Sequence, residues 1–251
     1  MGQAIAARLG QTDDLDCAAV WSRTPGRHAE RFPDGTRLDA DIHAVAGASD
    51  VLIDFSLPAG TVEAAAAAAR AACPLVCGVS GLGETQFDAL VRAAGHVPVV
   101  FDRNMSQGIA VLTDVVARVA HALGDEFRVT IDETHHVHKL DAPSGTALKL
   151  GEAVAAARER PLSDLMWYEQ AGEAPDDAIR FRVERRGEVP GDHAVRFESA
   201  TETLTLSHSV TTRSVFADGA LRAARWVHGR PPGLYSMADV LGLTADSKNP
   251  G

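Results

Sequence analysis

The feature that most constrains the fold is the regular alternation of short apolar runs with helical segments through the first hundred residues. The apolar runs are residues 17–21, 51–55, 75–79 and 98–101. The helical segments are residues 1–9, the alanine-rich stretch 59–72 and the stretch 87–94, where apolar residues recur at helical spacing. Short apolar strands separated by helices pair in parallel through right-handed crossovers. The sequence therefore predicts a doubly wound, Rossmann-like α/β domain with ligands at the carboxyl ends of its strands.

The pattern changes after Asn104, which indicates a second domain. Helices are expected at residues 106–123 and 145–160, with strands at 127–131, 179–184, 194–198 and 204–210. We expect an α+β substrate domain over residues 105–214, with a mixed, open and largely antiparallel sheet. Residues 1–104 and 215–251 would form the dinucleotide-binding domain, which ends with a helix over 214–228.

The composition excludes several classes of protein. Of the 251 residues, 45% are hydrophobic and 23% charged, which is typical of a globular chain. The net charge of −10, without a basic face, argues against nucleic-acid binding. The longest apolar run, residues 64–69, is too short to cross a membrane.

The cysteine content indicates where the protein works. Three cysteines without framework spacing indicate reduced thiols and a cytoplasmic protein. Cys73 and Cys77 are expected to be small buried residues rather than metal or redox ligands.

The candidate active site is residues 133–148, ETHHVHKLDAPSGTAL. An apolar strand leads into His135, and a helix begins after Ser144, a good N-cap residue. Gly145 and Thr146 would present free backbone N–H groups at the positive end of that helix, where a carboxylate can bind. Lys139 can reach the same anion, and a histidine can transfer a proton near neutral pH. The stretch therefore predicts a site that binds a small dicarboxylate and protonates it.

Two other interpretations of this stretch are weaker. A zinc site on His135, His136 and His138 lacks the i, i+4 spacing of helical ligands, and Lys139 would repel the cation, so we expect no metal. A merely solvated loop is at odds with the apolar flanks and the capped helix.

Four polar residues farther along the chain stay ambiguous in the sequence. Arg185 and His193 fit either a solvated turn or the substrate side of the site. His208 and Arg213 are expected to brace the sheet or an oligomer contact.

Residues 133–148 closely resemble the signature of bacterial 4-hydroxy-tetrahydrodipicolinate reductases (dihydrodipicolinate reductases), of diaminopimelate and lysine biosynthesis. The resemblance covers nearly the whole chain. It also includes VLIDFSLPAGT from Val51, GVSG from Gly78, DRNMSQG from Asp102, RRGEVPGDHAVRF from Arg185, and residues 208–220.

The resemblance implies an oxidoreductase that transfers hydride from NAD(P)H to a C=N-conjugated ring carbon. His135 would donate the proton, and Lys139 would act as the second acid or bind a carboxylate. The substrate-binding residues it implies are His136, Lys139, Ser144, Gly145 and Thr146. It also implies a homotetramer assembled through the sheet of the second domain.

The cofactor-binding part of the predicted active site is less complete in the sequence. Dinucleotide binding requires a strand and a glycine-rich turn before a helix N-terminus, whereas this chain opens at Met1 and Gly2 within the helix. We expect either that the missing strand and turn lie upstream or that the cofactor binds weakly, and we favour the first. The predicted cofactor-binding residues are Met1, Gly2, Ser22, Arg23, Gly78, Val79, Ser80, Asp102, Arg103, Asn104 and Met105.

The end of the strand predicted at residues 17–21 bears on the choice of cofactor. Ser22 stands where an NAD-binding fold has an acidic residue, and Arg23 and Arg27 follow. This pattern favours a 2′-phosphate and hence NADPH, with NADH as the alternative. Arg23 as a plain surface residue is the competing interpretation. The sequence departs from the family at Val79-Ser80, Asp102-Arg103 and Met105, on the nicotinamide side.

Two other functions compete with this one. The first is a related reductase with another imine substrate, since the helix start selects a carboxylate rather than a particular ring. The second is a weakly active or non-catalytic member of the family. The presence of both His135 and Lys139 argues against the second.

Overall fold

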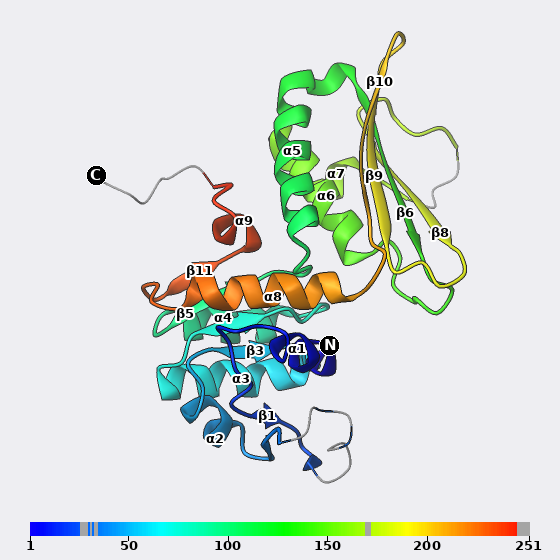
Figure 1. Ribbon diagram of the computed structural model, residues 1–251. Coiled ribbons are helices and arrows are strands. Elements are labelled where there is room, and N and C mark those ends of the chain that lie inside the picture. The colour runs from blue at the N-terminus through cyan, green and yellow to red at the C-terminus, as the bar shows by residue number, and fades with distance from the viewer. Residues whose placement is uncertain (26–29, 31, 33–34, 169–171, 245–251) are drawn as a thin grey trace. The chain divides into compact units, whose positions relative to one another are not determined.

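The computed structural model describes residues 1–25, 30, 32, 35–168 and 172–244. The chain divides into two compact units, which are coloured along the chain in Figure 1. One unit comprises residues 1–107 and 214–251, and the other comprises residues 108–213. The domain boundaries predicted from the sequence, after residue 104 and after residue 214, lie close to these.

The first unit is built on a parallel sheet. Its strands lie in the order β11-β5-β4-β3 and are β3 (Leu52–Asp54), β4 (Leu75–Cys77), β5 (Pro98–Phe101) and β11 (Gly233–Tyr235). The side chains of β4 are fully buried, because helices cover both faces of a doubly wound sheet. The parallel arrangement predicted from the sequence is confirmed.

Helices flank this sheet on both sides. They are α1 (Gly2–Leu9), α2 (Ile42–Gly47), α3 (Pro58–Ala71), α4 (Glu84–Ala94) and α8 (Ser214–Val227), with the short α9 (Met237–Val240) after β11. Helices α3 and α8 pack on opposite faces of the sheet (Figure 1). Pro58 starts α3 at a position that needs no backbone N–H, and the buried alanines of this helix allow close packing on the strands.

A cavity separates this sheet from a second, two-stranded one. β1 (Val20–Trp21) pairs in parallel with β2 (Leu38–Asp39), so the strand expected at residues 17–21 is shorter than predicted. The cavity, of about 470 Å³, is lined by residues of α1, β1 and β3. Among residues 1–25, all of which are described, no strand precedes β1. In the described part of the chain, β1 and β3 therefore lie in separate sheets, and both flank the cavity.

The second unit contains a five-stranded mixed sheet in the order β10-β9-β6-β8-β7. Its strands are β6 (Arg128–His135), β7 (Met166–Trp167), β8 (Ile179–Arg185), β9 (Asp192–Glu198) and β10 (Thr203–Ser209). β9 is antiparallel to β6 and β10, whereas β8 is parallel to β6 and β7. The mixed sheet predicted from the sequence is confirmed, although only two of its four described pairings are antiparallel. A helical crossover returns the chain from β6 to β8, and such crossovers make parallel pairs.

One face of this sheet is covered by helices and forms the core. Helices α5 (Gln107–Leu123), α6 (Gly145–Ala157) and α7 (Leu162–Leu165) lie on that side (Figure 1), and a 3-10 turn, η3 (Gly124–Glu126), follows α5. Val129 and Ile131 of β6 pack there with Val195 and Phe197 of β9, all fully buried. Because strand side chains alternate, the next two β6 residues on this face are Glu133 and His135.

The chain contains neither disulfide-bonded cysteines nor a membrane-spanning helix among its described residues. All three cysteines are free thiols. Burial raises the pKa of Cys73 to about 11 and that of Cys77 to about 12, so both are inert core residues. Among the described residues, no helix is long and apolar enough to cross a membrane.

We predict that Gly219→Ala destabilises the first unit. A Cβ at this position on α8 would overlap the backbone carbonyl of Met105, which cannot move without disturbing the loop after β5. Overpacking of this kind costs about 1–3 kcal/mol, measurable as a shift of the urea unfolding midpoint. Gly47→Ala is the control, because a Cβ there meets nothing within 4 Å. Equal midpoints for the two variants would contradict the prediction.

Candidate active site

Three polar side chains gather where the apolar face of the second sheet ends. Glu133 and His135 continue the inward row of β6, and His193 lies directly opposite Glu133 on the antiparallel β9. All three are buried, with exposed fractions of 2%, 7% and 5%. The sheet register therefore brings a carboxylate and two imidazoles together at the rim of the core.

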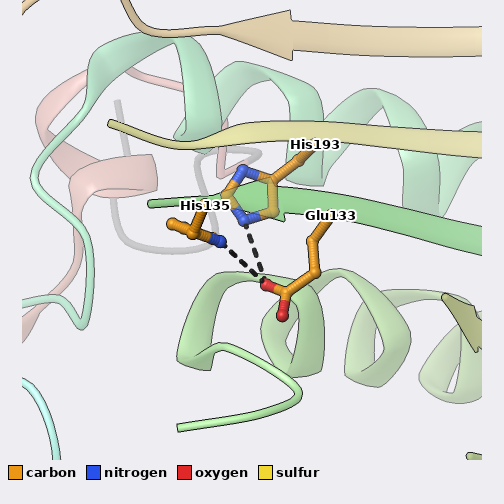
Figure 2. Close-up of side chains that lie close together, drawn as sticks. All are labelled: Glu133, His135 and His193. Atoms are coloured by element: carbon orange, nitrogen blue, oxygen red, sulfur yellow. Dashed lines mark ion pairs between the residues drawn. The ribbon is translucent and has the colours of Figure 1, made fainter. Parts of the chain in front are cut away.

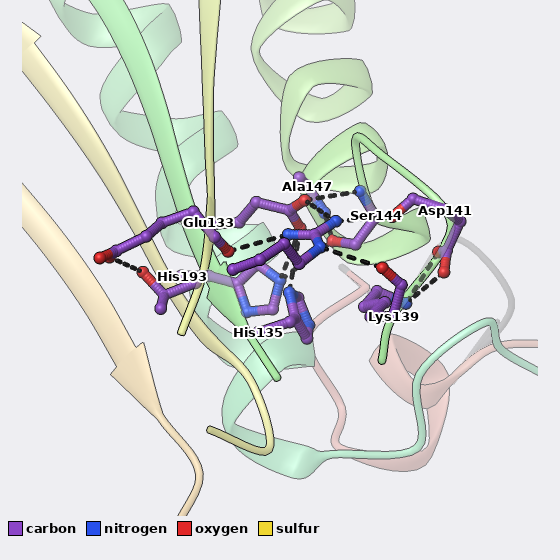
Figure 3. A network of polar contacts seen from close by, with 10 residues as sticks. Glu133, His135, Lys139, Asp141, Ser144, Ala147 and His193 are labelled. Atoms are coloured by element: carbon purple, nitrogen blue, oxygen red, sulfur yellow. Dashed lines mark hydrogen bonds and ion pairs between the residues drawn. The ribbon is translucent and has the colours of Figure 1, made fainter. Parts of the chain in front are cut away.

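The Glu133 carboxylate uses its two oxygens differently. Oε2 lies 3.3 Å from Nδ1 of His135 and 3.8 Å from Nε2 of His193 (Figure 2). Oε1 accepts hydrogen bonds from the backbone N–H of Ser144 at 3.1 Å and from Nη2 of Arg185 at 3.3 Å (Figure 3). The two imidazole rings meet edge to face, with centroids 5.0 Å apart. Glu133 is thus the centre of the cluster.

Helix α6 begins beside this carboxylate. Ser144 is its N-cap, as the sequence predicts: Oγ accepts the N–H of Ala147 at 3.2 Å and lies 3.2 Å from Nε2 of His193. Ser144 is buried, and its side chain is engaged in the helix cap. Gly145 and Thr146, in the first turn, are only partly buried, as a carboxylate seat requires.

The loop between β6 and α6 carries Lys139. Its ammonium pairs with the Asp141 carboxylate at 2.7 Å, and this carboxylate is largely exposed. Arg185 clamps the same loop, donating from Nε to the carbonyl of Lys139 at 3.2 Å and from Nη2 to that of Asp141 at 2.7 Å. Arg185 therefore braces the loop.

The other two histidines of the stretch lie apart from the cluster. The rings of His136 and His138 are 6.0 Å apart and tilted, and only His136 is partly buried. His138 is exposed and pairs with Glu188 at 3.2 Å. Of the histidines at 135, 136 and 138, only His135 meets Glu133.

Charge and burial set the protonation states of two residues of the cluster, Glu133 and His193. Burial raises the pKa of Glu133, but contacts with His135 and Ser144 more than offset this and lower the pKa to about 2. Burial and the neighbouring His135 lower the pKa of His193 to about 3. At neutral pH the cluster therefore holds a charged Glu133 and a neutral His193.

The cluster also has the spacing of a possible metal site. Glu133, His135 and His193 offer ligand atoms that all lie within 4.8 Å of one another. The Arg185 guanidinium, 3.3 Å from Glu133, and the nearby positive charge of Lys139 disfavour a cation there. These charges suit an anionic ligand better.

The first unit has features that fit a dinucleotide. Helix α1 begins directly after Met1, which makes no side-chain capping bond. Arg23 is exposed just after β1, and Gly81, with φ of 71°, forms an open turn after β4. Of the predicted cofactor residues only Gly2 lines the cavity between β1 and β3. Arg27 lies outside the described residues.

The residues predicted on the nicotinamide side differ in their exposure. Met105 and Asp102, after β5, and Val79, after β4, are at least 95% buried. Asp102 and Asn104 also accept backbone N–H groups two residues ahead, of Asn104 and Ser106, at 3.2 and 2.9 Å. Ser80 and Arg103 are exposed.

Sequence reasoning did not identify Glu133 or its partners as a cluster. The alternation of β6 carried a signal, because it places Glu133 and His135 on one face. The position of His193 beside them depends on the antiparallel register with β9, which no local pattern specifies.

Comparison with known proteins places these features in a family. Residues 1–105 match the family "Dihydrodipicolinate reductase, N-terminus" and residues 108–241 match "Dihydrodipicolinate reductase, C-terminus". The chain belongs to the dihydrodipicolinate reductase family. The 4-hydroxy-tetrahydrodipicolinate reductase of Halorhodospira halophila is 42% identical, covering 97% of this chain and 95% of its own. That of Alkalilimnicola ehrlichii is 39% identical over the same shares.

Solved structures show the same fold. Dipicolinate-bound dihydrodipicolinate reductase from Paenisporosarcina sp. TG-14 superposes with a TM-score of 0.75 at 20% identity, covering 95% of this chain and 94% of that one. An engineered D-amino acid dehydrogenase bound to NADP⁺ superposes with a TM-score of 0.57 at 15% identity, covering 99% and 93%. The two-domain architecture expected of the family is thus confirmed.

We predict that His193 makes the fold sensitive to mild acid. Its pKa of about 3 in the fold lies below the ordinary 6.5, so the unfolded chain binds a proton that the folded chain does not. The free energy of unfolding is therefore unaffected by this residue above pH 6.5. It decreases as the pH falls from 6.5 towards 3, because protons bind only to the unfolded state. Between pH 7.5 and 5 the loss is about 2 kcal/mol, measurable by urea unfolding at both pH values.

The matched variant is His193→Asn, whose amide can still bond to Ser144. This variant should lose less unfolding free energy than the wild type over the same interval. An unchanged pH dependence in His193→Asn would show that His193 is not the residue responsible.

Proposed function

We propose that this chain reduces 4-hydroxy-tetrahydrodipicolinate to tetrahydrodipicolinate in lysine and diaminopimelate biosynthesis, with His135 as the proton donor. The observation that carries this proposal is the placement of His135 against a buried carboxylate. Lys139 and the first turn of α6 belong to the same β6–loop–α6 segment. A proton donor and an anion-binding surface are thus built from one short stretch, in a chain of this family.

The substrate would bind through its carboxylates. The first N–H groups of α6, at Gly145 and Thr146, supply partial positive charge to one carboxylate. The Lys139 ammonium would exchange its exposed partner, Asp141, for another carboxylate of the substrate. These charges also draw electron density from the ring, so the groups that bind the substrate make it easier to reduce. His136, partly buried beside His135, would contact the same ligand.

His135 would transfer the proton. The Nδ1 side of its ring faces Glu133, so Nε2 is the nitrogen left to reach the substrate. A histidine changes charge near neutral pH, which suits a general acid.

The first unit would hold the cofactor. When bound, a reduced nicotinamide supplies the hydride. The start of α1 at Met1 and Gly2, the turn from Gly78 to Ser80 and the backbone after β5 would hold it. Ser22 and Arg23 follow β1 without an acidic side chain, which supports NADPH over NADH.

We also propose a cytoplasmic homotetramer. The three free cysteines fit a reducing compartment. Helices α5 and α6 lie on one side of the five-stranded sheet (Figure 1), and β10 forms its edge with mostly exposed residues. The opposite face is therefore open to other copies of the chain.

We predict distinct losses for His135→Ala and Lys139→Ala in NADPH oxidation with the condensation product of pyruvate and aspartate semialdehyde. Removal of the proton donor should lower kcat by about 10²–10⁴-fold. Loss of the ammonium should mainly raise KM, by about tenfold or more. The control is His138→Ala, an exposed histidine of the same loop, with kcat/KM near that of the wild type.

The outcomes separate the alternatives. If the wild type does not oxidise NADPH with this substrate, a related imine substrate or a non-catalytic role gains support. If it does, but neither variant is slower, the assigned roles are wrong.

We predict that Arg23→Ala lowers kcat/KM for NADPH by about tenfold and leaves that for NADH nearly unchanged, since only NADPH carries the 2′-phosphate. Arg37→Ala is the matched control, because this arginine is paired with Asp39 at 2.7 Å. Equal losses with both cofactors, or a wild-type preference for NADH, would contradict the role of Arg23.

A further inference from the structure

Glu133 is the most enclosed charged group of the site and has no part so far in the proposed chemistry. Its side chain is 1% exposed and lies between β6, β9 and the start of α6. Burying a carboxylate is costly unless it is paired and hydrogen-bonded. Here Oε1 accepts from Ser144 and Arg185, which anchors the carboxylate. The second oxygen, Oε2, is left for the imidazoles.

We propose that Glu133 is a positioning residue for His135: its Oε2 holds the Nδ1 side of the ring, so that Nε2 carries the proton delivered to the substrate. The inference rests on the function proposed above. Oε2 and Nδ1 lie 3.3 Å apart, without the alignment of a hydrogen bond, and Nδ1 has no other partner. A small rotation of either side chain makes the bond.

The surroundings of His135 limit its ring to this orientation. His193 meets it edge to face at 5.0 Å. On another side lies Gly191, with φ of 153°, where a Cβ would lie 3.0 Å from Nε2 and 3.3 Å from Cδ2. Only glycine leaves room for the ring there. Packing restricts rotation of the imidazole, and Glu133 then decides which nitrogen holds the fixed proton.

Titratable and charged groups surround the His135 ring from several strands. Glu133 on β6 and His193 on β9 face His135 directly. Arg185 on β8 acts through the Glu133 carboxylate. Lys139, paired with Asp141, and His208 on β10 lie farther out, within electrostatic reach of His193. Glu133 is the anion that meets Nδ1, so it also stabilises the imidazolium that precedes proton transfer.

The decisive variant is Glu133→Gln. The amide oxygen can still accept from Ser144 and Arg185, while the NH₂ group replaces Oε2 and donates to Nδ1. The ring then carries its proton on Nε2 in the neutral form and cannot release it without becoming an anion. A misplaced tautomer of this kind is known to disable a catalytic histidine. We expect kcat to fall by about 100-fold or more, with KM within about threefold.

The pH profile and a rescue separate positioning from general damage. The basic limb of the kcat profile should move at least about one pH unit lower in Glu133→Gln, because the imidazolium loses its carboxylate partner. Glu133→Asp keeps the charge but shortens its reach, so its kcat should lie between those of wild type and Glu133→Gln. It also serves as the test variant if the Gln variant does not fold.

The matched control is Asp132→Asn. Asp132 is the neighbour of Glu133 on β6 but points to the opposite face, where it pairs with Arg196 at 3.0 Å. This variant makes the same carboxylate-to-amide change outside the site, and its kcat, KM and pH profile should match those of the wild type.

A second readout does not depend on turnover. The ¹⁵N chemical shifts of His135 should show the neutral ring protonated on Nδ1 in the wild type and on Nε2 in Glu133→Gln. The same protonated nitrogen in both proteins, or a kcat profile of Glu133→Gln equal to that of Asp132→Asn, would overturn the inference. An inactive wild type would instead refute the proposed function, and the ¹⁵N shifts would still decide whether Glu133 orients His135.

Discussion

The buried carboxylate of Glu133 is the interaction on which the second unit depends. An anion with 2% exposure at the edge of an apolar core is stable only if donors surround it. The backbone of Ser144 and the guanidinium of Arg185 supply them, and so tie α6 and β8 to β6. Because Ser144 also caps α6, the bond that satisfies the carboxylate also fixes the start of this helix.

The two units use different means to prepare a site. In the second unit, the buried carboxylate of Glu133 lies against His135, and hydrogen bonds from Arg185 hold the loop that carries Lys139. In the first unit, residues of α1, β1 and β3 line a cavity of about 470 Å³.

Much of the fold followed from local patterns. The α3 helix, the β5 strand and the cap of α6 at Ser144 were all predictable, because periodicity and capping act within a few residues. The short strands β2, β7 and β11 were not, since two or three residues carry no periodicity and pair only because a neighbour is present. The parallel pairing of β6 with β8 was missed because the choice of a neighbouring strand depends on the tertiary fold rather than on local sequence.

The sequence alone determined the alternation of strands and helices, the family resemblance and the stretch that carries His135 and Lys139. Only the tertiary structure decided what surrounds them. Arg185 lies 52 residues from Glu133 in the chain, and His193 reaches it through the register of an antiparallel pair. Local sequence fixes backbone conformation over a few residues, whereas the partners of a buried charge are chosen by which strands become neighbours.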